Sequence, residues 1–329
     1  MGKVDKAARR YFSNNERFAD AFNSSLFKGI THVDPSALKE LDATRGMGRK
    51  ARDSLNEWRV MGDGTCAYAI LGVEAQALTH YLMPMRCAGY DIRSYERQAN
   101  EKRAEMKKAV EEKTAHPTSR ECMSGIFEGD RLIPAITLVV SLDSEGWKGP
   151  TKLHETLFLP DELRPFVPDW HINLIDPRAM DDAEFDAYAS DLGLVLKYIK
   201  HAGDGRREIR RMVSEDDRYN HLHQEAVDLL NASTDSRLRY DPGEEWVNVS
   251  NAMREMREYE RQQGRQEGLQ EGHQEGRQEA TLETQTHAIR AIMTSFSVDA
   301  EEAMDVLQIP EGERGLYRDE LAKARAAVS

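Results

Sequence analysis

Residues 53–74 read DSLNEWRVMGDGTCAYAILGVE. In this stretch DSLNEWRV (53–60) and CAYAILGVE (66–74) are strand-like runs on either side of Gly62-Asp63-Gly64-Thr65. Asp-Gly between two such runs is a strong hairpin signal. With Asp63-Gly64 at the tip of the turn, Asp53 falls opposite Glu74 on the neighbouring strand. Like charges directly opposite each other destabilise a sheet, so this pairing predicts a cation shared by the two carboxylates.

The chemistry expected at this position is that of a divalent metal ion. Side chains alternate along a strand, so Gln76 shares a face with Glu74 if the strand extends that far. A hard cation such as Mg2+, or Mn2+ in its place, prefers oxygen ligands. Such an ion polarises a phosphodiester and lowers the pKa of an attacking water. The alternative is an ordinary exposed pair of side chains with no chemistry.

Outside the hairpin, the periodicity predicts an α/β fold. We expect an amphipathic helix over 5–28, with Phe12, Phe18, Phe22 and Leu26 roughly on one side, and a long helix over 84–113. We also expect one or two helices within 205–232 and strands over 132–141 and 171–176. A further helix is expected over 181–201, with a buried apolar stripe of Phe185, Tyr188, Leu192, Leu196 and Ile199. The run LIPAITLVVS at 132–141 is continuously apolar and β-branched, which is typical of a strand covered on both faces. Strands interleaved with helices over about 245 residues indicate a largely buried sheet.

The C-terminal part has a different composition. GRQEGLQEGHQEGRQEA (264–280) repeats Gly every four residues. We interpret this segment as a marginal helix or spacer, strengthened by self-association, because each Gly weakens a helix. Residues 285–309 resemble a short helical hairpin that ends before Pro310. The expected domains are therefore 1–245, a spacer over 246–284, and a small helical hairpin domain over 285–329.

The composition and charge of the chain limit the classes of function that it can have. The chain has 329 residues, of which 40% are hydrophobic, and a net charge of -13. It contains no run of about 20 apolar residues, so we expect no membrane span. Three cysteines without CxxC spacing, and no apolar leader, predict a cytoplasmic protein. Residues 1–110 hold 19 Lys and Arg against 14 Asp and Glu. This basic third predicts a positively charged surface that binds phosphate groups. The alternative is that these charges cluster by chance on solvated helix faces.

Several long segments resemble one nuclease family. They are YFSNNERFADAFNSSLFKG (11–29), RDSLNEW (52–58), LGVEAQALTHYLMPMRCAGYD (71–91), RLIPAITLVVSLDSEGWKGPTKLHE (131–155) and INLIDPRAMDDAEFDAYASDLGLVLKYIK (172–200). Together with the Gly-rich repeat and the terminal hairpin, they resemble the recombination-promoting nuclease (Rpn) and transposase family of the PD-(D/E)XK superfamily. The resemblance covers nearly the whole chain.

This resemblance implies a restriction-endonuclease-like mixed sheet flanked by helices, with a C-terminal helical extension. It implies that Asp53 and Glu74 are the metal-binding acids. Gln76 stands where the superfamily more often has Lys, and an amide there can still orient a water. Asp20 matches an acidic position that precedes the core. Arg52 precedes Asp53 where the nominal signature has Pro.

The remaining site residues are expected to contact nucleic acid. Arg86 and Tyr90 match family positions, one helical turn apart, from which they could reach phosphate. The basic residues that we expect to steer the DNA backbone are Arg45, Arg49, Lys50, Arg52, Arg93 and Arg97.

We therefore expect a Mg2+-dependent DNA endonuclease in recombination or transposition of mobile elements. A homodimer is expected because a two-fold dimer most simply cuts two antiparallel strands. One alternative is an inactive nuclease fold that binds DNA or protein. Another is an assembly or regulatory protein that acts through its helical tail, including in phage defence.

Overall fold

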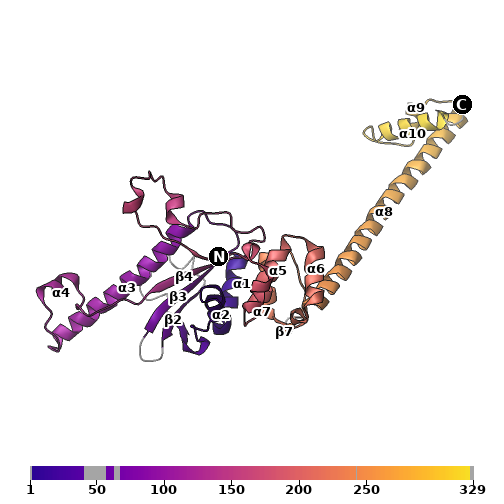
Figure 1. The fold of residues 1–329 in the computed structure, drawn as a ribbon. Coiled ribbons are helices and arrows are strands. Elements are labelled where there is room, and N and C mark those ends of the chain that lie inside the picture. The colour runs from indigo at the N-terminus through magenta and orange to yellow at the C-terminus, as the bar shows by residue number, and fades with distance from the viewer. Residues whose placement is uncertain (1, 41–56, 63–66, 242, 327–329) are drawn as a thin grey trace. The chain divides into compact units, whose positions relative to one another are not determined.

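The computed structural model of the protein describes residues 2–40, 57–62, 67–241 and 243–326. Within these ranges one mixed sheet has the strand order β1-β2-β3-β4-β5 (Figure 1). Its strands are β1 (Leu38–Glu40), β2 (Glu57–Gly62), β3 (Ala67–Gln76), β4 (Ala135–Ser141) and β5 (Asn173–Ile175). The first three strands are antiparallel neighbours, and β3, β4 and β5 run parallel. The expected mixed α/β class and the helical C-terminal region are confirmed.

The β2–β3 hairpin is present, but its predicted register is wrong. The predicted turn would pair Ser54 with Val73, whereas the structure pairs Glu57 with Val73. The register also shifts between Met61 and Gly62. The physical reason is a longer connection than the assumed two-residue turn, since β2 ends at Gly62 and β3 begins at Ala67. An odd change of register reverses the face to which each side chain points.

Two helices replace the single amphipathic helix expected over 5–28. They are α1 (Lys3–Phe12) and α2 (Asn15–Ser25). The chain breaks at Asn14 because its side chain accepts hydrogen bonds from the backbone N–H groups of Glu16 and Arg17, which caps α2. Phe12, Phe18 and Phe22 are still buried, so the predicted apolar side of this segment is confirmed.

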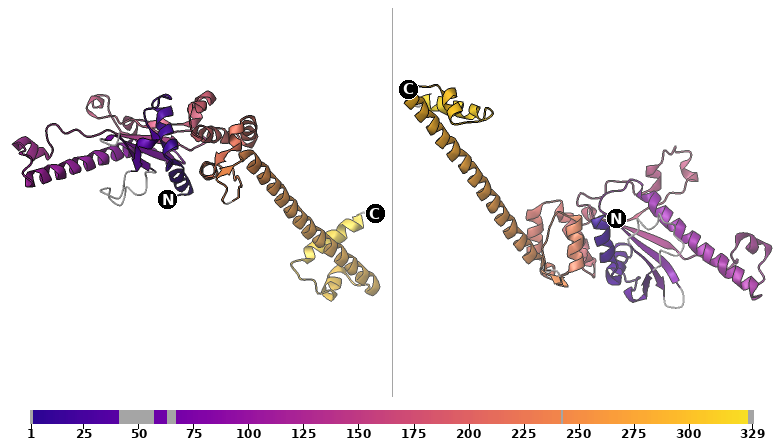
Figure 2. Two further views of the ribbon diagram at one scale, coloured as in Figure 1. Left: turned by 90° about the horizontal axis from the view of Figure 1, so that it is seen from below. Right: turned by 180° about the vertical axis from the view of Figure 1, so that it is seen from behind.

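The sheet is covered on both faces (Figures 1 and 2). On one face, Leu71 and Val73 of β3 pack in the main core with α1, α2 and α5 (Leu192–Ala202). On the other face, Ile70 packs with Tyr90 of α3 (Met83–Glu111). Because strand side chains alternate, the even-numbered residues of β3 face α3. The long helix expected over 84–113 and the strand expected over 132–141 are both present.

The helix expected over 181–201 is also divided. Residues Asp182–Ala187 form a 3-10 helix, and α5 begins at Leu192. Between them, the carboxylate of Asp20 accepts hydrogen bonds from the backbone N–H groups of Ala189 and Ser190, so these residues do not continue a helix. The predicted apolar stripe is nevertheless buried at Phe185, Tyr188, Leu192, Leu196 and Ile199.

Smaller elements complete the described chain. The helices are α4 (Ser119–Ser124), α6 (Arg206–Glu215) and α7 (Gln224–Ser233), and the short strands are β6 (Leu222–His223) and β7 (Trp246–Val247). Further 3-10 turns span Pro35–Ala37, Leu153–Thr156, Arg164–Phe166, Pro177–Ala179 and Asp217–Asn220.

Internal contacts divide the chain into two units, Met1–Met256 and Arg257–Ser329. The second unit contains most of α8 (Val249–Phe296), with α9 (Ala300–Val306) and α10 (Arg314–Ala326). Its small core consists of Ile289, Ala303, Met304, Ile309 and Tyr317. The Gly-rich repeat is helical, and side chains 257–281 of α8 are exposed. Among the described residues, no helix is both long and apolar enough to cross a membrane.

Candidate functional site

Glu74 lies near the carboxyl end of β3, in the layer between the sheet and α3. Its side chain is only 1% exposed. Its Oε1 accepts one hydrogen bond from Nε2 of Gln76 at 2.7 Å and another from Nη2 of Arg86 at 2.8 Å. Gln76 ends the same strand and Arg86 lies in the first turns of α3. The strand and the helix therefore bring Glu74 and Gln76, which were predicted to be catalytic, into contact with Arg86, which was predicted to bind DNA.

The second carboxylate oxygen of Glu74, Oε2, is buried and makes no hydrogen bond to any described residue. Buried polar atoms in proteins nearly always have a hydrogen-bond partner. Burial raises the pKa of Glu74 to about 8, while the charge of Arg86 lowers this pKa and that of Asp5 raises it. A cation beside Oε2 would satisfy this oxygen and favour the ionised carboxylate.

Arg86 is held in place by Tyr90, one turn further along α3. The Tyr90 hydroxyl accepts hydrogen bonds from Nε of Arg86 at 3.2 Å and from Nη2 at 2.8 Å. Tyr90 is 2% exposed, whereas the Arg86 side chain is 23% exposed. The guanidinium is thus fixed between a carboxylate and a phenol and still reaches the surface. This is a suitable arrangement for contacting a phosphate oxygen.

Arg93 and Arg97 continue the same side of α3. The guanidinium carbon of Arg93 lies 5.2 Å from the centroid of the Tyr90 ring. The Nε atoms of both arginines are buried and make no hydrogen bond within the described chain. Nε of Arg97 lies 3.8 Å from a carboxylate oxygen of Glu101, which is too far for a hydrogen bond. Arg86, Arg93 and Arg97 therefore form a row of cations that starts at Glu74.

Asp91 belongs to this layer and was not predicted from the sequence. Its carboxylate accepts a hydrogen bond from Oγ1 of Thr137 on β4 at 3.0 Å. Burial raises the pKa of Asp91 to about 6, although the Thr137 hydrogen bond lowers it. The sequence did contain a signal, because Asp91 follows Met83 and Cys87 at four-residue spacing on the buried side of a helix. An acidic residue in that pattern is unusual.

Asp20 lies on α2 and is bonded to a different part of the fold. Its Oδ1 accepts hydrogen bonds from Ser24 Oγ and Ala189 N, and its Oδ2 accepts them from the backbone N–H and the hydroxyl of Ser190. None of these contacts involves Glu74 or Gln76. Asp20 lines a cavity of about 340 Å³ between α2 and the segment before α5. Its catalytic role stays a prediction.

The other predicted residues lie outside the described ranges. These are Asp53, the expected first metal ligand, and the basic residues Arg45, Arg49, Lys50 and Arg52. Among the described side chains, no group of three or more His, Cys, Asp or Glu residues could hold a metal ion. The family resemblance assigns a second metal ligand to Asp53, but the observed β2–β3 register no longer supports the predicted pairing of Asp53 with Glu74.

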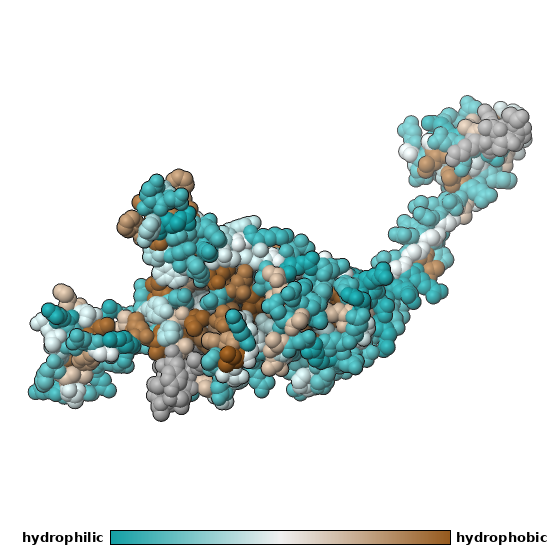
Figure 3. Space-filling view, in the orientation of Figure 1, coloured by the Kyte–Doolittle hydropathy of each residue, from teal (hydrophilic) through white to brown (hydrophobic). Residues whose placement is uncertain are grey.

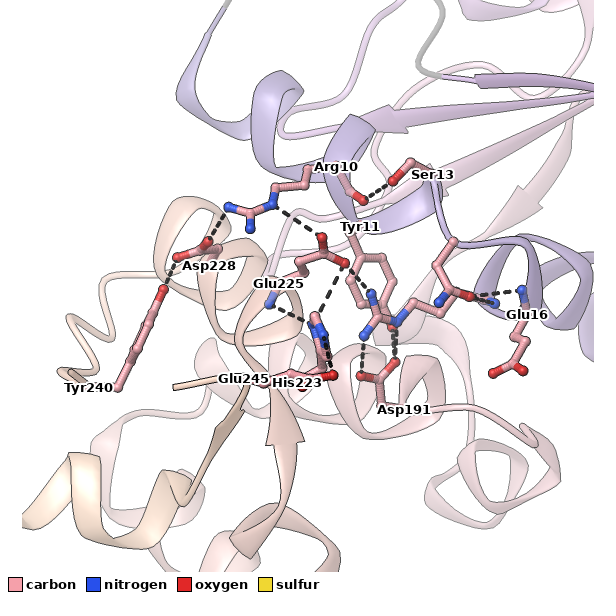
Figure 4. Close-up of polar contacts among 12 residues, drawn as sticks. Arg10, Tyr11, Ser13, Glu16, Asp191, His223, Glu225, Asp228, Tyr240 and Glu245 are labelled. Carbon is pink, nitrogen blue, oxygen red and sulfur yellow. Dashed lines mark hydrogen bonds and ion pairs between the residues drawn. The ribbon is translucent and has the colours of Figure 1, made fainter. Parts of the chain in front are cut away.

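A second ionic cluster connects α2 to α5 and α7 (Figure 4). Arg17 is 6% exposed and donates two hydrogen bonds to Asp191, at 2.8 and 3.0 Å, and one to Glu225 at 2.8 Å. The Tyr11 hydroxyl also donates to Asp191, at 2.8 Å. Every charge here has a bonded partner, so we assign this cluster to the fold. Sequence reasoning missed it because Asp191 and Glu225 are 174 and 208 residues from Arg17.

Comparisons with protein-family models, with curated proteins and with solved structures each returned no match for this chain.

Proposed function

We propose that the protein is a Mg2+-dependent endonuclease that hydrolyses DNA phosphodiesters. The observation that supports this most is the buried Oε2 of Glu74, a carboxylate oxygen that no described residue hydrogen-bonds and that lies beside Gln76 and Arg86. The resemblance to recombination-promoting nucleases supplies the reaction class, a restriction-endonuclease-like core and a setting in recombination or transposition.

The residues present fit a hard divalent cation such as Mg2+ or Mn2+. Glu74 would hold it through Oε2, together with Asp53. When bound, such an ion supplies charge neutralisation and lowers the pKa of a coordinated water. An oxygen donor is the ligand type that these ions prefer. Burial raises the pKa of Glu74, and the positive charge of such an ion would favour the ionised carboxylate against that burial.

The other side chains have separate tasks in this proposal. Gln76 holds Oε1 of Glu74 by its amide nitrogen, and its amide oxygen accepts a hydrogen bond from the attacking water. Arg86 binds a non-bridging oxygen of the scissile phosphate and stabilises the charge that develops there. Tyr90 positions Arg86 through the two hydrogen bonds to its hydroxyl. Arg93 and Arg97, with the basic residues 45–52, bind the flanking phosphates.

Plasmid cleavage at low salt with Mg2+ tests this function. Wild type is expected to nick and linearise the plasmid. Glu74→Gln keeps the shape of the side chain and removes its charge, so it should lose at least about a hundredfold in rate. Glu162→Gln, an exposed glutamate on a loop, is the matched control and should cleave as wild type does. Equal cleavage by Glu74→Gln and wild type would contradict the assignment.

The second candidate is a nuclease fold without chemistry. It is favoured by one observation, namely that Gln76 and Arg86 already bond to Oε1 of Glu74. Such a protein would bind DNA in the presence of each of several divalent ions and would not cleave it.

The proposed homodimer would be measured in the same preparations by sedimentation.

A further inference from the structure

Four large apolar side chains are exposed on the connection from β3 to α3 and on the first turn of α3, close in sequence to Glu74. Leu78, Tyr81, Leu82 and Met85 are between 45% and 73% exposed. We call these four residues the connection patch. Figure 3 shows hydrophobic surface gathered where the sheet meets the amino-terminal end of α3. Isolated exposed apolar residues are common, but four within eight residues form a contiguous surface that indicates binding.

The connection patch is held in its exposed position. The backbone N–H of Leu82 donates to Nδ1 of His80 at 3.2 Å, and that of Met83 donates to the His80 carbonyl at 3.0 Å. The backbone N–H of Lys148 donates to Oγ1 of Thr79 at 3.1 Å. Met83, in the middle of the patch sequence, is fully buried. The four exposed side chains are therefore presented by a fixed connection.

The connection patch also lies next to the site. It joins Gln76 to Arg86, the two residues that bond to the same oxygen of Glu74. Leu78 is two residues from Gln76, so their Cα atoms are within about 7 Å. Leu82 precedes Arg86 by four residues, on the same side of the helix start. A polymer that contacts Arg86 can therefore also contact this surface.

The row of arginines on α3 indicates that the ligand of this surface carries phosphate groups. From Arg86 to Arg97 the row extends about 16 Å along α3, at about 1.5 Å per residue. The Arg86 side chain is 23% exposed, so a phosphate oxygen can reach its guanidinium at the start of the row. An apolar and aromatic surface followed by a row of arginines matches a polymer with exposed bases on one side and phosphates on the other.

We infer that this surface binds single-stranded DNA, with an unpaired base against Tyr81 and its phosphates along Arg86, Arg93 and Arg97. A duplex hides the faces of its bases in the stack and presents phosphates, sugars and groove edges, so it offers no base face on which an aromatic side chain can stack. Unpaired bases stack on aromatic side chains, while cations follow the backbone. The inference deepens the proposed function by naming an unpaired strand as the preferred substrate over a duplex, and the cleavage part of it rests on that function.

Fluorescence anisotropy without divalent ions tests the binding. A labelled single-stranded DNA oligonucleotide should bind wild type at least about tenfold tighter than the same sequence in a duplex. Tyr81→Ala should weaken single-strand binding about tenfold or more, as expected for loss of one stacked base, and leave duplex binding unchanged. Tyr81→Phe should bind as wild type does. Phe296→Ala removes an equally exposed aromatic ring from the C-terminal unit and should have no effect.

Other results would overturn the inference. Duplex binding as tight as single-strand binding would do so, as would equal single-strand affinities for wild type and Tyr81→Ala. A change from dimer to monomer in Tyr81→Ala, with its DNA affinity kept, would show that the patch binds a second copy of the chain. Circular dichroism of each variant confirms folding, which we expect because Tyr81 is 67% exposed.

The binding assay also separates this inference from the proposed function. Tight single-strand binding through Tyr81 with no cleavage in Mg2+ refutes the nuclease and supports the binding surface. Cleavage that needs Glu74 but prefers a duplex, and is unchanged in Tyr81→Ala, supports the nuclease and refutes the surface.

Discussion

At the scale of single residues, the pKa of Glu74 couples stability to pH. This pKa is raised from 4.5 to about 8. Between these values the folded protein keeps a proton that the unfolded chain has lost, so the free energy of unfolding falls as pH rises, by up to about 1.4 kcal/mol per pH unit. In EDTA, urea unfolding should show this loss in wild type across that window. Glu74→Gln cannot ionise and should show a smaller loss.

The same measurement has a positive and a negative control. Adding Mg2+ above the pKa of Glu74 should restore stability in wild type, because a ligand that binds only the folded state stabilises it. Glu162→Gln should keep the wild-type pH dependence. If Glu74→Gln and wild type lose stability equally with pH, Glu74 titrates as an ordinary exposed glutamate.

Arg86 is the residue that most opposes the raised pKa of Glu74, because its charge lowers that pKa. Arg86→Met keeps the length of the side chain and removes the charge. We expect the pKa of Glu74 to rise further, so the pH window of stability loss extends upward by about one unit or more. Arg86→Met should also reduce cleavage by at least about tenfold. An unchanged pH window would mean that the ion pair at 2.8 Å does not persist in solution.

At the scale of elements, the predicted helices were wrong at the points where a side chain accepts hydrogen bonds from backbone N–H groups and so interrupts the helix. Periodicity correctly predicted α3, β4 and the buried stripe around α5. It could not locate the breaks at Asn14 and at Ala189–Ser190, since these depend on which backbone groups a side chain caps. The partner of Ala189 and Ser190 is Asp20, about 170 residues earlier, and no local pattern contains that information.

Substitution of Asp20 distinguishes a structural role, as acceptor for the backbone N–H groups before α5, from a catalytic role. Asp20→Ala leaves two partly exposed backbone N–H groups without their acceptor, so it should lower the free energy of unfolding by about 1 kcal/mol. Asp161→Ala, at an exposed aspartate, is the control and should change little. Urea unfolding measures both. Asp20→Asn keeps the volume of the side chain, and full stability with no cleavage in that variant would show a catalytic role.

The exposed glycines of α8 give a second prediction at this scale. A Cβ at Gly264, Gly268, Gly272 or Gly276 would meet no atom within 4 Å. Changing all four to Ala should therefore stabilise the helix, by about 1 kcal/mol per position. Loss of helical circular dichroism on heating should then occur at a higher temperature. A lower melting temperature would show that another chain packs against this strip.

At the scale of the whole molecule, the sequence predicted the mixed α/β class of the fold. Glu74, Gln76, Arg86 and Tyr90 meet because a strand end and the following helix are joined by a short connection, but the roles assigned to them from the sequence stay predictions. The hairpin register was wrong because turn length cannot be deduced from Asp-Gly alone. Only the side-chain geometry shows that Oε1 of Glu74 is hydrogen-bonded while Oε2 has no partner among the described residues.

Metal binding in the absence of nucleic acid is the most direct test of the Glu74 site. Isothermal titration with Mn2+ should show binding to wild type, with an affinity that rises with pH up to the pKa of Glu74, about 8, because the ligand must be ionised. Glu162→Gln should bind equally well, and Glu74→Gln should lose the site. Absence of Mn2+ binding in wild type, or equal binding in Glu74→Gln, would contradict a metal-dependent nuclease centred on this carboxylate.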